Sequence, residues 1–223
     1  MITYTNEDCM ELMARYPDKH FDLAIVDPPY GIGADCMTLG NGKNKIFRGN
    51  SKWDSNTPND NYFTELYRIS KNQIIWGANH YPQFLSKSAG WIFWDKGTGA
   101  NDFSDGELAY TSFDKALRKI FVSWVGANAK DYGERMHPTQ KPVKLYKWLL
   151  TNYAKQGDLI LDTHVGSASS LIACHDLGFD AVGCELDADY YAESKKRLEW
   201  HMKQPKLFEI EQEQPKQIDL LEE

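Results

Sequence analysis

Long apolar segments, targeting segments and paired cysteines are all missing from this 223-residue sequence. No run of about 18 apolar residues occurs, and the amino terminus is not basic and then apolar, so the sequence predicts neither a membrane span nor a secretory signal. The four cysteines form no C-x-x-C pair, which argues against a structural zinc site or a disulfide framework. We therefore expect a protein without a metal, in the reducing cytoplasm.

Basic residues are in the minority. The chain has 25 Lys and Arg against 32 Asp and Glu, a net charge of −7, which speaks against a protein that coats nucleic acid over its whole surface. A local basic face remains open, because many acids gather in the carboxyl-terminal stretch. They are Glu209, Glu211, Glu213, Asp219, Glu222 and Glu223. We expect one domain over residues 1–202 and an acidic tail over 203–223 that is either disordered or a docking strip.

A buried strand that stops at a polar corner is the first informative feature. The apolar run Phe21–Val26 ends at Asp27-Pro28-Pro29-Tyr30, and proline both stiffens the chain and removes a hydrogen-bond donor. This corner offers a carboxylate, a free carbonyl and an aromatic face where open α/β sheets place their ligands. These groups suit an exocyclic amine on a flat heterocycle. The alternative is a turn with a purely structural role.

The second half of the chain has the pattern of a nucleoside-binding unit. A strand over residues 158–162 is followed by a turn of small residues around Gly166, a helix ending at Leu177, and a strand that ends at Glu185. Small residues let the backbone approach a ligand, and a terminal carboxylate can pair with ribose hydroxyls. The turn contains only one glycine, so this pattern alone does not identify the ligand.

Hydrophobic periodicity predicts an α/β protein. Strands are expected over residues 1–5, 21–26, 73–76, 90–96, 107–113, 119–125, 158–162 and 180–185, and the longer helices over 9–13, 60–71, 143–153 and 188–202. We expect the first two strands to pair in parallel around the first helix. The alternating segments 107–113 and 119–125 are expected to form an antiparallel pair.

The connection over residues 31–61 is long and rich in glycine and asparagine, which is typical of a functional or disordered loop. We expect a mobile lid beside the polar corner. Its basic residues would meet phosphates, although a solvated loop that carries charges is the alternative. They are Lys43, Lys45, Arg48 and Lys52.

Four motifs occur in a characteristic order along the chain. They are Asp27 to Tyr30, the run His137-Pro138-Thr139-Gln140-Lys141-Pro142, Leu161-Asp162 with Gly166-Ser167, and Gly183 to Tyr191. This set resembles the S-adenosylmethionine-dependent DNA amino-methyltransferases of the permuted beta type. Two further stretches, Ile75 to Tyr81 and Phe93 to Lys96, resemble short methylases carried by phages and prophages. The resemblance implies a Rossmann-like methyltransferase fold, with a seven-stranded, mostly parallel sheet and one antiparallel strand. It also implies a bacterial or phage-infected cell as the setting.

The resemblance implies a catalytic role for the polar corner. Asp27 and the Pro28 carbonyl would accept the two hydrogens of an adenine amino group and aim its nitrogen at the methyl donor. Pro29 would keep the corner stiff, and Tyr30 would stack on a base flipped out of the duplex. The expected reaction is methylation of adenine N6, at a specific or loosely specified site.

The resemblance also implies the cofactor residues. Glu185 would bind the ribose hydroxyls, with Leu186 beside it. Asp8 would bind the adenine end of the cofactor, and its position before a helix also predicts an N-cap. Thr139 and Lys141 would meet the methionine carboxylate at a helix start. The methionine portion would lie near the reacting carboxylate. Its lining would be Asp27, Asp162, His164, Gly166 and Ser167.

The chain departs from the family pattern in three respects. Thr163-His164 stands where the family usually has Pro-Phe, and Ala168 stands in place of a second glycine. Replacing Phe by His164 removes an apolar wall beside the cofactor. A role for His164 as a general base is the alternative. The segment 97–136 leaves little room for target recognition, with Arg118, Lys119 and Arg135 as the candidates for backbone contacts with DNA. The acidic surface suggests that two copies pair as a homodimer to build a longer basic groove.

Two other functions remain open at this stage. Cytosine N4 methylation uses the same geometry, although enzymes of that kind more often carry Ser where this chain has Asp27. A catalytically silent methyltransferase-like subunit that binds DNA or a partner is suggested by the altered glycine turn and opposed by the intact Asp27 to Tyr30 set.

Overall fold

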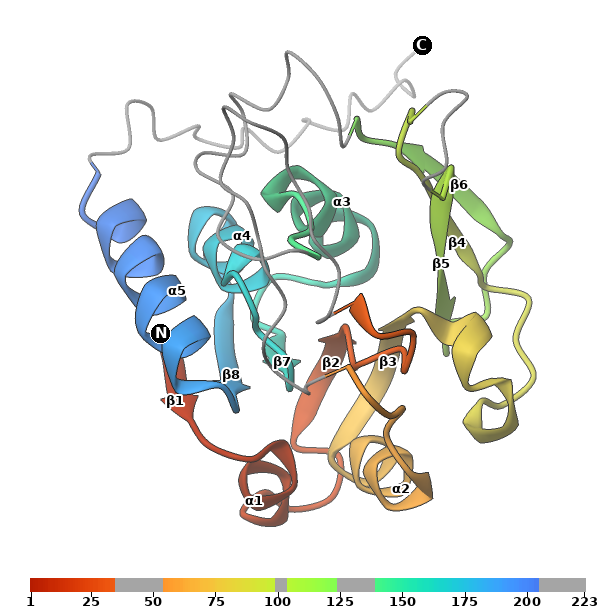
Figure 1. The fold of residues 1–223 in the computed structure, drawn as a ribbon, viewed down its shortest axis with the longest axis horizontal. Helices are drawn as coiled ribbons and strands as arrows, with labels where there is room; N and C mark the ends of the chain where they lie inside the picture. The colour runs from red at the N-terminus through yellow and green to blue at the C-terminus, as the bar shows by residue number, and fades with distance from the viewer. Residues whose placement is uncertain (35–53, 99–103, 124–138, 205–223) are drawn as a thin grey trace, which may run out of the picture.

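The computed structural model describes residues 1–34, 54–98, 104–123 and 139–204, which form one α/β sheet structure (Figure 1). The strands are β1 (Ile2–Asn6), β2 (Phe21–Val26), β3 (Ser70–Trp76), β4 (Ile92–Asp95), β5 (Gly106–Thr111), β6 (Arg118–Phe121), β7 (Leu159–Asp162) and β8 (Asp180–Glu185). The α-helices are α1 (Cys9–Ala14), α2 (Asp60–Ile69), α3 (Val143–Tyr153), α4 (Ser169–Leu177) and α5 (Ala188–Met202); the 3₁₀ turns η2 (Ala78–His80) and η3 (Pro82–Phe84) follow β3.

The sheet has eight strands in the order β1-β8-β7-β2-β3-β5-β4-β6, as many as periodicity predicted and one more than the family resemblance implied. Among the described strands, β5 alone is reversed, since it pairs antiparallel with both β3 and β4 while the other pairs are parallel. The α/β fold with a mostly parallel sheet and one antiparallel strand is therefore confirmed.

Two expected strand pairings are wrong. β1 and β2 are not neighbours, because β8 and β7 lie between them, and β1 pairs with β8 instead. β5 and β6 are not an antiparallel pair either, because β4 lies between them and pairs in parallel with β6. The physical reason is that a strand's apolar pattern specifies which faces are buried but not which strand completes its hydrogen bonds.

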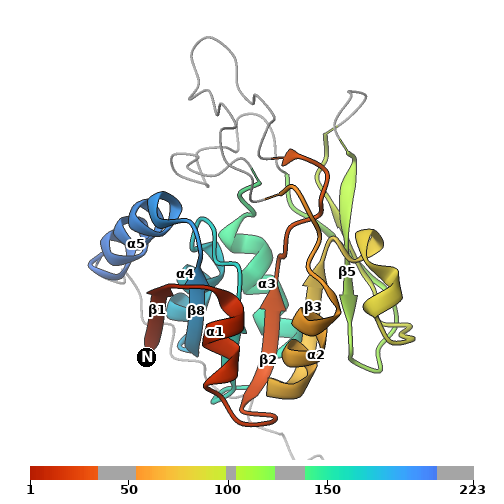
Figure 2. The same ribbon diagram turned by 60° about the horizontal axis from the view of Figure 1, so that its bottom comes forward.

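Helices cover both faces of the sheet, and alternate residues of each central strand belong to different cores. In β2, Leu23 and Ile25 pack in the cluster that contains α3, α4 and Leu198 of α5. Ala24 and Val26 pack in the cluster that contains α1 and α2. Figures 1 and 2 show the same three-layer arrangement. No helix in the described ranges is long and apolar enough to cross a membrane.

The carboxyl ends of β8, β7 and β2 meet at one edge of the sheet, because these three strands are parallel neighbours. The polar corner after β2 and the turn after β7 therefore lie side by side, as they should in an open α/β sheet that binds a ligand. The amino end of β5 reaches the same edge, since that strand runs the opposite way. This last feature brings Glu107 to the site.

Candidate active site

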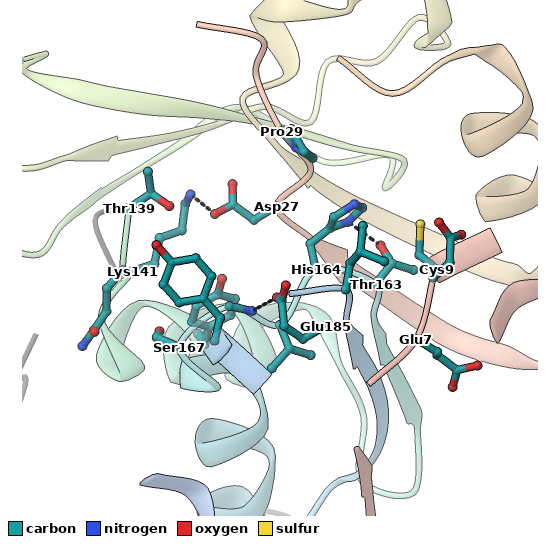
Figure 3. Close-up of a pocket in the computed structure, with 17 residues that line it drawn as sticks. Glu7, Cys9, Asp27, Pro29, Thr139, Lys141, Thr163, His164, Ser167 and Glu185 are labelled. Atoms are coloured by element: carbon teal, nitrogen blue, oxygen red, sulfur yellow. Dashed lines mark hydrogen bonds and ion pairs between the residues drawn. The ribbon is translucent and has the colours of Figure 1, made fainter. Parts of the chain in front are cut away.

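A pocket of about 870 Å³, measured out to its open mouth, lies at this edge of the sheet (Figure 3). Residues from both halves of the chain line it: Glu7, Asp8, Cys9, Asp27, Pro29, Thr139, Gln140, Lys141, Tyr146, Thr163, His164, Val165, Gly166, Ser167, Glu185, Leu186 and Tyr190. Most of the residues expected for catalysis and cofactor binding are thus brought together here.

Glu185, at the end of β8, organises the wall of the pocket below the glycine turn. Its Oε2 accepts a hydrogen bond from the backbone N–H of Gly166 at 2.9 Å, and its Oε1 accepts one from the N–H of Asp187 at 3.0 Å. Burial raises the pKa of Glu185. Each carboxylate oxygen keeps a further lone pair, so the side chain can still accept hydrogen bonds from a ligand such as a ribose.

The turn after β7 leaves room for a ligand at Gly166. A Cβ added to Gly166 would meet no atom within 4 Å, which means that the backbone borders open space there. Ser167 and Leu186 also line the pocket, and Leu186 is 67% exposed at its rim. This open backbone edge and the carboxylate of Glu185 fit a bound nucleoside.

Asp162 is not in the pocket lining, contrary to the expected contact with the cofactor. It is 2% exposed, and its carboxylate accepts hydrogen bonds from the Ser170 hydroxyl at 2.5 Å and from the His164 N–H at 3.0 Å. Burial raises the pKa of Asp162 to about 7. Asp162 therefore supports the turn from beneath and shapes the pocket through other residues.

Ala168 has the left-handed backbone conformation that favours glycine, with φ of 61°. The altered motif thus keeps the backbone shape that the usual glycine would adopt, at a conformational cost of about 1–2 kcal/mol for a side-chain-bearing residue. The missing glycine changes the strain of the turn and does not abolish the turn.

His164 lines the pocket and is held by its neighbours. Its Nδ1 lies 2.9 Å from the Thr163 hydroxyl, which in turn lies 2.7 Å from the Tyr62 hydroxyl, and its ring packs against the Tyr62 ring. Burial lowers the pKa of His164 to about 4, so the imidazole is neutral near pH 7. The position usually taken by Phe is therefore filled by an uncharged aromatic ring.

Asp8 caps α1, as expected, and also lines the pocket. Its side chain accepts a hydrogen bond from the N–H of Met10 at 2.7 Å. The neighbouring Cys9 lines the same wall, and burial raises the pKa of its thiol to about 12, so the thiol stays protonated. This end of the pocket offers a carboxylate beside an apolar surface.

The acceptor end of the pocket centres on Asp27. Its Oδ2 accepts a hydrogen bond from Lys141 Nζ at 2.5 Å, and its Oδ1 accepts one from the Tyr30 hydroxyl at 2.6 Å. Figure 3 shows Lys141 and Asp27 pointing toward each other. The Lys141 ammonium therefore faces the polar corner at Asp27, whereas the family resemblance implied the methionine carboxylate of the cofactor as its partner. Thr139, which was expected beside it, also lines the pocket.

Two charged residues that sequence reasoning missed complete this corner. Glu107 of β5 lies with its Oε2 3.0 Å from Lys141 Nζ and 3.2 Å from the Tyr30 hydroxyl. Lys96 lies 2.5 Å from Glu107 Oε1. The alternating apolar and polar pattern around Glu107 predicts a strand but gives no indication of a role at the site. Glu107 reaches this edge of the sheet because β5 runs opposite to its neighbours.

The position of Tyr30 depends on three further residues to which the sequence analysis assigned no role at the site. Asp54, which is 1% exposed, accepts hydrogen bonds from the backbone N–H groups of Tyr30 and Gly31 at 2.7 and 2.9 Å. The Tyr30 ring stacks on His80 with centroids 5.0 Å apart. It also packs so closely on Gly77 that an added Cβ would lie 2.0 Å from Tyr30 Cε1.

The predicted DNA contacts are placed only in part. Arg118 and Lys119 are on the outer strand β6, where Lys119 pairs with Asp95 at 2.8 Å. Arg118 is at the amino end of β6 and shares a surface pocket with Tyr153 of α3, so it faces away from the edge that carries Asp27. The other candidates lie outside the described residues. They are Lys43, Lys45, Arg48, Lys52 and Arg135.

Known proteins resemble this chain in sequence and in fold. The Type II methyltransferase M2.MboI of Moraxella bovis is 27% identical over 236 residues, which cover 85% of this chain and 85% of that protein. The solved M1.HpyAVI–SAM complex superposes with a TM-score of 0.58 at 18% identity, over 89% of this chain and 99% of that one. The cytosine-N4-specific PvuII DNA methyltransferase gives a TM-score of 0.57 at 14% identity, over 93% of this chain and 88% of that one.

The family model described as DNA methylase, which covers N6 and N4 methyltransferases, matches residues 71–196. This segment is more than half of the chain and contains Glu107, Lys141, Gly166 and Glu185 of the pocket. The solved structures, which are 18% and 14% identical to this chain, show that the fold is shared as well. The protein therefore belongs to the DNA methylase family, the S-adenosylmethionine-dependent DNA amino-methyltransferases.

Proposed function

We propose that this protein transfers a methyl group from S-adenosylmethionine to N6 of an adenine base in DNA. The observation that carries the proposal is the position of Asp27, a carboxylate that shares one pocket with Glu185 and the open backbone at Gly166. One ligand can thus occupy the nucleoside end while a second presents an amine to the carboxylate. Adenine is preferred to cytosine because of Asp27, where N4-cytosine enzymes more often carry Ser.

The residues present fit the cofactor. Glu185 can accept hydrogen bonds from ribose hydroxyls, Asp8 can accept one from the adenine amine, and Gly166 lets the backbone approach the ligand. When bound, S-adenosylmethionine supplies an electrophilic methyl group on a sulfonium. We assign Thr139 to its carboxylate and leave Lys141 to the acceptor side, where its ammonium is 2.5 Å from Asp27.

The acceptor residues act by positioning. Asp27 and the Pro28 carbonyl accept the two N–H hydrogens of the base amine, which localises and aims the nitrogen lone pair. The base stacks on the face of Tyr30 that His80 does not cover, after it has been flipped out of the duplex. No deprotonation is needed before attack, because the product ammonium loses its proton readily.

Two features of the proposal concern the DNA partner. Because Arg118 faces away from the pocket, we assign the contacts with the DNA backbone to the cations of the 31–61 connection and to Arg135, all of which lie outside the described part of the chain. A homodimer would lengthen the basic groove, and sedimentation with and without DNA tests it. A companion nuclease gene would place the activity in restriction and modification, and an isolated phage gene in self-protection.

The test is methyl transfer from tritiated S-adenosylmethionine to unmethylated DNA, followed by digestion to nucleosides. We expect the label in N6-methyl-2′-deoxyadenosine and its loss in Asp27→Asn, with cofactor binding and folding retained. Glu65→Gln on α2, which removes one carboxylate charge from a surface ion pair with Arg68, is the matched control. Label in N4-methyl-2′-deoxycytidine would show that the target base is cytosine and not adenine. Cofactor binding without any methyl transfer would favour a catalytically silent subunit.

A further inference from the structure

The carboxylate that should receive the substrate amine already holds two donors. Lys141 Nζ lies 2.5 Å from Asp27 Oδ2, and the Tyr30 hydroxyl lies 2.6 Å from Oδ1. An ammonium group is a hydrogen-bond donor of the same kind as an amino group. Lys141 therefore holds an acceptor position on the Asp27 oxygen for which the N–H of a base would compete.

The Lys141 ammonium cannot leave Asp27 without another acceptor. Lys141 is 3% exposed, and a buried cation without a partner is strongly destabilising. Glu107 Oε2 is already 3.0 Å from the ammonium and 3.2 Å from the Tyr30 hydroxyl. Small shifts would thus transfer either donor from Asp27 to Glu107.

Glu107 is held in place for this exchange. Lys96, directly after β4, lies 2.5 Å from its Oε1, which leaves Oε2 directed at Lys141. Burial raises the pKa of Glu107, but Lys141 and Lys96 outweigh that effect and bring the pKa to about 2, so the side chain is an anion. The four side chains alternate in sign from Asp27 to Lys96 and sum to zero charge.

We propose that Glu107 is a positioning residue that takes over the Lys141 ammonium when the substrate amine binds Asp27. The exchange frees an Asp27 oxygen while every buried charge keeps a partner. Glu107 touches neither the cofactor nor the base and acts only through Lys141 and Tyr30. This role rests on the proposed methyl transfer to a base amine.

The experiment is single-turnover methyl transfer with the full-length protein, preloaded with tritiated S-adenosylmethionine and mixed with saturating unmethylated DNA. In Glu107→Gln the amide oxygen carries no charge and is a weaker acceptor for the cation, so Lys141 stays on Asp27 and we expect transfer to slow by about tenfold or more. The dissociation constant for S-adenosylmethionine should stay within about twofold, because the cofactor groups are unchanged. Glu107→Asp, which keeps the charge, should restore part of the rate.

A double variant separates positioning from stability. Glu107→Gln leaves Lys96 without its carboxylate, and adding Lys96→Met removes that surplus positive charge. We expect the double variant to regain thermal stability while its transfer stays slow. The surface change Glu65→Gln is again the matched control, with a rate like that of the wild type.

The outcomes are distinct. A slow Glu107→Gln with normal cofactor affinity, together with a slow but stable double variant, supports the proposal. A rate in Glu107→Gln within about twofold of the wild type, or a rate that recovers with stability in the double variant, overturns it. If the wild type itself transfers no methyl group, the proposed function fails instead.

Discussion

The Lys141 ammonium and the Asp27 carboxylate lie 2.5 Å apart although 114 residues separate them in the chain. Burial alone would raise the pKa of Asp27 and lower that of Lys141, and each ion offsets this effect on the other. Glu107 and Tyr30 complete the cluster. Together with Lys96, which pairs with Glu107, this polar corner is a charge-balanced network drawn from four segments of the chain, and its parts can be tested one at a time.

Gly77 should be essential for the position of Tyr30. In Gly77→Ala the new Cβ would lie 2.0 Å from the Tyr30 ring, at a residue with φ of 64°, so the ring must leave His80. We expect a loss of stability of about 1–3 kcal/mol from overpacking and a methyl-transfer rate at least about tenfold lower. Urea unfolding and the tritium assay measure the two effects.

Gly157→Ala is the matched control for Gly77→Ala. It places the same methyl group at a positive φ of 92°, in a position where no atom lies within 4 Å. It should cost only the conformational strain, about 1–2 kcal/mol, and leave the transfer rate unchanged. Equal rate losses in Gly77→Ala and Gly157→Ala would contradict the role assigned to the contact with Tyr30.

Asp54 should fix the chain after the catalytic corner. Its carboxylate accepts hydrogen bonds from the N–H groups of Tyr30, Gly31 and Ala34, so Asp54→Ala leaves three donors without their acceptor. We expect a destabilisation of about 2–4 kcal/mol, moderated where water replaces the carboxylate. Hydrogen exchange at these amides should quicken, and transfer should slow. Asp18→Ala, at a carboxylate that is 78% exposed, should change stability by less than about 0.5 kcal/mol.

Ala168 should respond to glycine in the opposite way from a helical alanine. Ala168→Gly removes the left-handed strain, about 1–2 kcal/mol, and loses one buried methyl group, about 0.8 kcal/mol, so stability should be unchanged or slightly higher. The same change at Ala173, in the middle of α4 and equally buried, should cost about 1 kcal/mol from helix propensity alone. If both variants lose equal stability in urea unfolding, the strain at Ala168 is absent.

Asp162 should make stability depend on pH between about 4 and 7. Its pKa rises from roughly 3.9 in an unfolded chain to about 7 in the fold, because the carboxyl is buried. The folded state holds the proton more tightly, so this contribution is fully present below pH 4 and is lost as the pH rises through 7. Asp162→Asn, which cannot ionise, should flatten this part of the stability curve. An unchanged difference between wild type and variant across this range would contradict the assignment.

Much of the fold followed from periodicity and turn chemistry. The strand before Asp27, the β7–turn–β8 unit ending at Glu185, and helices α3 and α5 lie within a residue or two of the expected bounds. These segments are readable because burial on one or both faces imposes a local pattern. The same local pattern does not predict which strands pair with each other, and both strand pairings expected from the sequence were wrong.

The residues themselves determined the chemistry of the site: an acid and two prolines after a buried strand, an acid at the end of β8, and small residues in the turn between. Their order also pointed to the family. Only the tertiary structure decided that Lys141 faces Asp27, that Asp162 lies beneath the turn, and that Glu107 and Asp54 complete the corner. The reason is that local sequence controls backbone shape and burial, whereas the partner of a buried charge is set by which strands become neighbours and in which direction they run.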